Sequence, residues 1–254
     1  MLSFVGLGLY DARSVTVVGA ERIAAADAVF LELYTSQLPG ATVAELEAAH
    51  GVAITRVDRA TVESDPAVIL DAAAAGPTVF LTAGDPMVAT THVDLRLRAI
   101  EAGIATEVLH GVSAQTAASG LTGLQNYKFG RAVTLPFPRA GGPVVPPSVQ
   151  TAIDANTAAG LHTLVFLDID APAERYLRAD AAAAQLAEAA PERLGVAVAR
   201  AGSPDPLVRA GPLRSLAAGA YGPPLHMVIL PGELHHIEAE ALAVLGDHPD
   251  LLTR

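Results

Sequence analysis

The chain contains no cysteine, and this absence excludes several classes of site at once. Disulfide frameworks, thiolate zinc sites and cysteine nucleophiles all require that residue. No apolar run reaches the roughly 18 residues that a membrane span needs. Basic residues are also few, since 16 of them face 27 acidic residues and leave a net charge of −11. A general nucleic-acid binder would need a basic face, so this charge balance disfavours one.

The familiar catalytic and nucleotide-binding motifs are missing as well. There is no P-loop and no GxSxG nucleophile motif. The segment GLGLYD at residues 6–11 begins like a dinucleotide-binding turn, but Asp11 stands where the third glycine belongs. The N-terminus has no basic stretch before its apolar residues and meets a glycine turn within ten residues. It therefore predicts a first strand and not a signal peptide, and we expect a cytoplasmic protein.

In the first half of the sequence, strand-like and helix-like segments alternate. Strands are expected over 2–8, 28–33, 52–57, 77–83 and 105–111, and helices over 17–27, 41–50 and 92–103. Thr42, with Glu45 three residues later, is typical of a capping box at a helix start. This βαβα order predicts a mainly parallel sheet with helices on its faces.

The second half has a different pattern, and we place a domain boundary between residues 110 and 111. This gives two α/β domains, 1–110 and 111–254. In the second domain, helices are expected over 113–123, 148–158, about 172–189 and 235–245. Strands are expected over 131–137, 161–169, 194–201, 206–211 and 225–232, and residues 136–147 form a proline- and glycine-rich loop.

Three polar segments follow strands of the first domain: GLGLYD, LELYTS (31–36) and AGDPMVATTH (83–92). Because ligands of open α/β sheets bind at the carboxyl ends of the strands, these segments predict a ligand-binding edge. Glu32 stands where a dinucleotide fold places a ribose-binding carboxylate. Asp85 is either a ligand contact or an ordinary turn aspartate. Thr90 and Thr91 are expected to cap the next helix, and the alternative is that Thr90 or His92 lines the ligand site.

Other candidate residues lie in the second domain. Asp168 ends a strongly hydrophobic strand, at the edge where a cleft between the domains would open. His235, His236, Glu238 and Glu240 resemble a metal cluster, but adjacent histidines on a helix point about 100° apart, so a solvated helix start is the better interpretation. Lys128 is the only lysine beside fifteen arginines, either because a compact cation is needed there or by chance.

Further motifs carry a family resemblance. NYKFG (126–130), HTLVFLDI (162–169), ARAGS (199–203) and LPGELHHIEAE (230–240) follow GLGLYD, YTS and GDPMVATTH in an order and spacing similar to archaeal diphthine synthases. GLG and GDP are shared with the wider tetrapyrrole-methylase superfamily, whereas YTS, ATTH, NYKFG and HTLVFLDI are more specific. The resemblance runs from residue 2 to about residue 245.

The resemblance implies two α/β domains of the tetrapyrrole-methylase type, with S-adenosylmethionine bound in the cleft between them, and a homodimer. It implies trimethylation of the amino group on the 3-amino-3-carboxypropyl-histidine of translation elongation factor 2, which yields diphthine and S-adenosylhomocysteine. The implied cofactor contacts are Leu9, Asp85, Val88, Ser113, Ala114, Leu167, Ala201 and His226. Of these, His226 is matched through PPLH, one residue longer than the family's usual PPH, and Ala83 replaces a proline that is common before GDP.

Three alternatives remain open at this stage. A corrin-pathway methyltransferase would share GLG, GDP and the cofactor but act on a tetrapyrrole. A nicotinamide-dependent oxidoreductase would need the third glycine to be dispensable. A non-catalytic partner of the translation machinery would keep only the fold. For a methyltransferase we expect no essential general base, because desolvation alone can lower the pKa of an attacking amine.

Overall fold

The structure, a computed structural model, describes residues 1–253 and divides into two compact units, one of Met1–Ala114 and one from Gln115 on. The two units are described separately. The domain boundary that the sequence places after residue 110 stays a prediction.

The first unit is built on a parallel five-stranded sheet with the order β3-β2-β4-β1-β5. Its strands are β1 (Leu2–Gly6), β2 (Ala28–Glu32), β3 (Thr55–Val57), β4 (Thr78–Thr82) and β5 (Thr106–Leu109). Its helices are η1 (Ala12–Ser14), α1 (Val17–Ala24), α2 (Val43–His50), α3 (Arg59–Glu63), α4 (Ala67–Ala75) and α5 (Val93–Glu101). The parallel sheet predicted from the sequence is confirmed.

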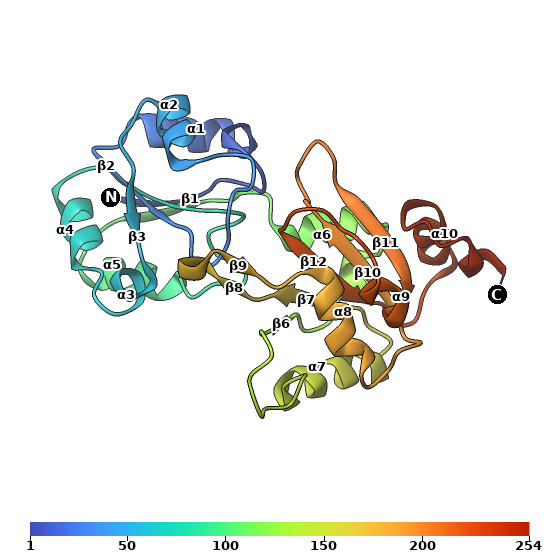
Figure 1. Cartoon of the computed structure of the whole chain (residues 1–254). Coiled ribbons are helices and arrows are strands. Elements are labelled where there is room, and N and C mark those ends of the chain that lie inside the picture. Colours follow the sequence, from blue (N-terminus) through green and yellow to red (C-terminus); the bar gives the residue numbers. More distant parts are fainter. Residues whose placement is uncertain (254) are drawn as a thin grey trace. The chain divides into compact units, whose positions relative to one another are not determined.

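Strand periodicity divides the core of this unit between the two faces of the sheet. Phe4, Phe30 and Phe80 pack with residues of α3, α4 and α5, whereas their strand neighbours Val5 and Leu31 pack with residues of α1 and α2. Figure 1 shows these two helix groups on opposite faces of the sheet. Covering both faces explains why the strands are continuous apolar runs.

The second unit contains a mixed sheet with the order β11-β10-β12-β7-β6, in which only β6 and β7 are parallel. Its strands are β6 (Val133–Leu135), β7 (Thr163–Leu167), β10 (Leu194–Ala199), β11 (Leu207–Pro212) and β12 (His226–Leu230), and a hairpin joins β8 (Ile169–Asp170) to β9 (Arg175–Tyr176). The helical segments from residue 114 on are α6 (Ala114–Thr122), η2 (Asn126–Lys128), α7 (Pro147–Ala158), η3 (Ala171–Ala173), α8 (Ala179–Ala187), α9 (Leu213–Ala217), α10 (His236–Leu245) and η4 (Pro249–Thr253).

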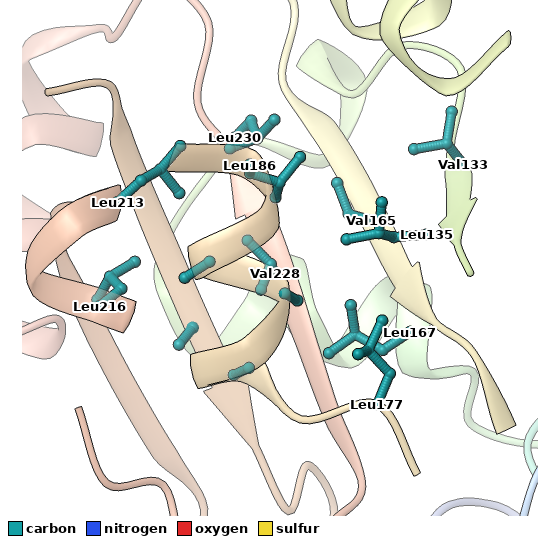
Figure 2. Packing of buried hydrophobic residues seen from close by; sticks show 14 of the residues in the cluster. Val133, Leu135, Val165, Leu167, Leu177, Leu186, Leu213, Leu216, Val228 and Leu230 are labelled. Atoms are coloured by element: carbon teal, nitrogen blue, oxygen red, sulfur yellow. The ribbon is translucent and has the colours of Figure 1, made fainter. Parts of the chain in front are cut away.

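One face of this sheet carries the main core of the unit. Val165, Leu167 and Val228 from the strands pack against Leu186 of α8 and Leu213 of α9, as Figure 2 shows. Alanines fill most of the buried positions of α8, so this helix lies close to the sheet. The α/β fold class is therefore confirmed for the chain.

Several sequence predictions need correction. The helix expected over about 172–189 begins only at Ala179, because Pro172 lies in η3 and Glu174 adopts a left-handed conformation (φ 48°) that starts the return strand β9. Helices α3, α4 and α9 were not predicted. Neither threonine caps α5: His92 is its N-cap residue, without a side-chain capping bond, and the Thr91 hydroxyl binds Glu63.

Candidate functional site

Three strands of the first sheet end so close together that no side chain fits between them. A Cβ atom on Gly6, which ends β1, would lie 2.5 Å from the carbonyl oxygen of Gly84 and 2.6 Å from the nitrogen of Gly111. Gly8 and Gly84 pair through two main-chain hydrogen bonds of 3.2 and 2.7 Å. A Cβ built on Gly84 would itself meet no atom within 4 Å, so a ligand can approach the main chain of this turn.

Asp85 fixes the conformation of the turn that follows β4. One carboxylate oxygen accepts the backbone N–H of Met87 at 2.9 Å, and the other lies 2.7 Å from Nδ1 of His110. The carboxyl group is almost buried, whereas the His110 side chain is 72% exposed. His110 was not singled out from the sequence, although its position just after β5 could have placed it at this edge. Val88, on the same loop as Asp85, is 37% exposed and free to contact a ligand.

The other predicted cofactor contacts of this unit lie on segments that follow strands at the same edge of the sheet. Leu9 follows β1 and is half-buried. Ser113 is 9% exposed, and Ala114 begins α6, a few residues after β5. The predicted residues of the first unit therefore lie on segments that follow β1, β4 and β5, strands that are neighbours in the sheet.

Glu32 lies at the end of β2 but cannot serve as a ribose-binding carboxylate. It is 0% exposed, and both of its oxygens are already occupied. Oε2 accepts the backbone N–H groups of Tyr34 and Thr35, each at 3.0 Å, and Oε1 accepts the hydroxyls of Thr35 and Thr82. Burial also raises the pKa of the neighbouring Tyr34 phenol. Because both oxygens of Glu32 are occupied, the structure disfavours the nicotinamide-dependent oxidoreductase.

In the second unit, the three predicted contacts gather at one edge of the mixed sheet. Leu167 ends β7, Ala201 follows β10, and His226 begins β12. Because β12 runs antiparallel to both of its neighbours, its start pairs with their ends, as the partners His226 and Ala199 show. Leu167 and His226 are buried and Ala201 is half-buried.

The imidazole of His226 is fully engaged inside the unit. Its Nδ1 accepts the backbone N–H of Ala179 at 3.1 Å, so Nε2 carries the proton that binds the Pro223 carbonyl at 2.9 Å. Burial lowers the pKa of this histidine, which agrees with the neutral form that these two bonds require. A ligand at His226 would therefore meet its main chain or its ring carbons.

Asp168 has a local role at the end of β7. Its carboxylate accepts the backbone N–H of Ile169 at 3.0 Å and that of Phe137 at 3.3 Å. These bonds hold the start of the proline- and glycine-rich loop that follows β6.

Lys128 forms an ion pair with a buried carboxylate. Its ammonium lies 2.6 Å from Oε2 of Glu238, which is 0% exposed. Glu238 also accepts hydrogen bonds of 2.8 Å from Nε2 of His162 and from the backbone N–H groups of Gln125 and His235. Burial alone would raise the pKa of Glu238, but these donors outweigh it and lower the pKa to about 2.

The other polar residues at the start of α10 surround the helix N-cap. His235 is the N-cap residue, and its Nδ1 accepts the Ile237 N–H at 3.4 Å. His235, His236 and Glu240 are exposed, as predicted for a solvated helix start, but the prediction was wrong for Glu238, which is buried. Within residues 1–253, no three His, Asp or Glu side chains are placed to hold a metal ion. No helix in that range is long and apolar enough to cross a membrane.

Comparisons with known proteins agree with this geometry. The model of the tetrapyrrole (corrin/porphyrin) methylases matches residues 1–217. The chain belongs to this family. Within it, the chain is 58% identical to a diphthine synthase of Haloquadratum walsbyi over 250 residues, which are 98% of this chain and 96% of the relative. A diphthine synthase of Halobacterium salinarum is 57% identical, over 98% of both chains.

A solved structure agrees with the relationship to diphthine synthases. A crystal structure of a diphthine synthase superposes with a TM-score of 0.90 at 35% identity and covers 97% of this chain and 96% of that one. The resemblance stated from the motifs is therefore confirmed, both in sequence and in fold.

Proposed function

We propose that this chain is a diphthine synthase. In this proposal it transfers methyl groups from S-adenosylmethionine to the amino group of the 3-amino-3-carboxypropyl-histidine of translation elongation factor 2, until that nitrogen is trimethylated. The observation that carries the proposal is the 58% identity to a diphthine synthase over 98% of the chain. The motifs that distinguish these enzymes from other tetrapyrrole methylases are present in full, and no corresponding observation favours a tetrapyrrole substrate.

The residues present fit such a cofactor. The main chain of the turn around Gly84 is open to a ligand, and the carboxylate of Asp85 places negative charge close by. We propose Leu9, Asp85, Val88, Ser113, Ala114, Leu167, Ala201 and His226 as its contacts. The cleft that the resemblance implies stays a prediction.

Bound S-adenosylmethionine would supply an electrophilic methyl group on a cationic sulfonium. The protein has to align the amine with that methyl and to exclude water from it. The first-unit turn, fixed by the bond from Met87 to Asp85, would hold the donor in place, and the apolar Val88 of the same loop would shield it. A dedicated nucleophile is not required, because the substrate amine itself attacks.

The decisive experiment is mass spectrometry of elongation factor 2 that carries the unmethylated precursor histidine. After incubation with the protein and S-adenosylmethionine, the target peptide should gain the mass of one CH2 group per transfer and stop at three. Cofactor binding without any gain would refute this substrate, and a co-purifying pigment would then support a tetrapyrrole. Binding of the elongation factor without transfer would support a non-catalytic partner, and tight NADH binding would support an oxidoreductase.

The assembly and location are part of the same proposal. We propose a cytoplasmic homodimer, as the resemblance implies. Light scattering coupled to size-exclusion chromatography should give twice the chain mass of 26.0 kDa, and a monomer mass would refute the dimer.

A further inference from the structure

The first unit buries a carboxylate without a lysine or arginine partner among the described residues. Glu32 is 0% exposed, and its hydrogen-bond donors are the backbone N–H groups and hydroxyls described above. Burying a charge without a cation is costly, so an apolar residue would serve the core better. The arrangement of its donors shows what the carboxylate does instead.

Glu32 joins the loop after β2 to the end of β4. The N–H groups of Tyr34 and Thr35 belong to that loop, whereas Thr82 is the last residue of β4, separated by one residue from the Gly84–Asp85–Pro86 turn. One carboxylate therefore holds the loop after β2 against the strand that carries this turn.

His92 makes a second, separate contact with the turn. Its Nδ1 lies 3.1 Å from the carbonyl oxygen of Pro86, whereas its Nε2, 3.6 Å from Oε1 of Glu32, has no hydrogen-bond partner among the described residues. A carbonyl oxygen only accepts, so Nδ1 carries a proton and donates it to this bond. The ring is 1% exposed and packs edge-on against Phe80 and Tyr34, with centroid separations of 5.0 and 6.4 Å.

We propose that Glu32 and His92 are positioning residues that hold the Gly84–Asp85–Pro86 turn in its cofactor-binding conformation. This inference rests on the proposed function, because it assigns the turn to S-adenosylmethionine. Neither side chain reaches a ligand. They act through the Pro86 carbonyl and the end of β4, and a displacement of about 1 Å in such a support can cost as much as 100-fold in function.

Two substitutions of His92 separate positioning from packing. His92→Phe keeps the ring between Phe80 and Tyr34 but loses the donor to Pro86. His92→Asn loses the ring but keeps an amide N–H at the place of Nδ1. If His92 only fills the core, His92→Phe should weaken cofactor binding less than His92→Asn does. If His92 positions the turn, His92→Asn should weaken cofactor binding less, although it should lower the stability more.

The measurement is the dissociation constant of S-adenosylhomocysteine by calorimetry, together with the melting temperature and the KM and kcat for S-adenosylmethionine. We expect His92→Phe to weaken binding about 10-fold or more, with KM raised more than kcat is lowered, and His92→Asn to stay within about 3-fold. Wild-type affinity in folded His92→Phe, or weaker binding in Asn than in Phe, would overturn the inference.

Two threonines of β4 provide a milder variant and its control, should a His92 variant fail to fold. Thr82→Val removes one hydroxyl that donates to Glu32, at the end of β4 next to the turn. We expect this variant to bind S-adenosylhomocysteine a few-fold more weakly. Thr78→Val makes the same change at the far end of β4, where the hydroxyl binds the Gly76 carbonyl, and should leave S-adenosylhomocysteine binding unchanged. Equal affinities of the two variants would refute the inference. Failure of the wild-type protein to bind S-adenosylhomocysteine would instead refute the proposed cofactor, and the inference with it.

Discussion

Replacing Glu238 by glutamine should destabilise the second unit strongly, because every group that faces this carboxylate is a donor. The backbone N–H groups of Gln125 and His235 and the ammonium of Lys128 cannot accept hydrogen bonds. Nor can Nε2 of His162, because its Nδ1 already accepts the N–H of Gly232 at 3.0 Å and Nε2 must therefore carry the proton.

The magnitude follows from the pKa of Glu238. A fall from the ordinary value of 4.5 to about 2 corresponds to about 3 kcal/mol of stability in favour of the charged carboxylate. Glutamine loses this contribution, and its NH2 group also faces two donors in either orientation. We therefore expect Glu238→Gln to lower the free energy of unfolding by about 3–5 kcal/mol at pH 7, the range for a broken buried pair.

The effect has a defined pH dependence. The pKa of Glu238 is lowered in the folded state, so its contribution is complete above the unfolded pKa of 4.5 and is lost as the pH falls toward about 2. The difference between wild type and Glu238→Gln should therefore be constant from pH 7 to pH 5 and should shrink below that.

Urea denaturation followed by circular dichroism at pH 7, 5 and 3 measures both quantities. Glu240→Gln is the matched control, since Glu240 is exposed on the same helix and should lose almost nothing. An unchanged unfolding midpoint for Glu238→Gln at pH 7 would refute the reasoning. A deficit that is as large at pH 3 as at pH 7 would show that charge is not its cause.

Three further predictions concern other parts of the chain. Lys128→Met should cost about 2 kcal/mol, less than a fully buried pair, since the lysine side chain is 21% exposed. Gly6→Ala should cost about 3 kcal/mol or more, because its Cβ would overlap the main chain of Gly84, whereas Gly120→Ala in α6, with open space around it, should gain up to about 1 kcal/mol. Asp85→Asn should keep kcat within about 10-fold, because the amide oxygen still accepts the N–H that fixes the turn.

Each of these has a simple check. Urea midpoints test the lysine and glycine variants, and equal stabilities of Gly6→Ala and Gly120→Ala would contradict the close approach of the strand ends. For Asp85→Asn, lost turnover with intact cofactor affinity would show that Asp85 acts as a general base.

The gathering of these polar segments at one edge of the sheet was predictable, because parallel strands carry their carboxyl ends to the same side. Asp85 and the segments after β1 and β4 lie there as expected, and Thr42 and Glu45 form the predicted capping box. These features depend on residues that are near in sequence or on a general rule of sheet topology.

What the sequence could not predict depends on distant partners. Lys128 and Glu238 are separated by 110 positions, so nothing near either residue reveals the pair. Glu32 stood at a ribose-binding position, but Thr82 and the loop after β2 occupy its oxygens. The hairpin of β8 and β9 was hidden by an alanine-rich stretch with strong helix propensity, which Glu174 interrupts through its backbone conformation.

The single lysine also determines how the protein can be handled chemically. Reagents that attack primary amines find only two in the whole chain, the Lys128 side chain and the N-terminus. The first is held in the ion pair with Glu238, and the second donates to the Ala73 carbonyl at 2.7 Å. Amine coupling to a surface or a dye should therefore be slow, and acylation of Lys128 would remove the cation that pairs with Glu238. Labelling through an introduced cysteine avoids this, because the native sequence has no competing thiol.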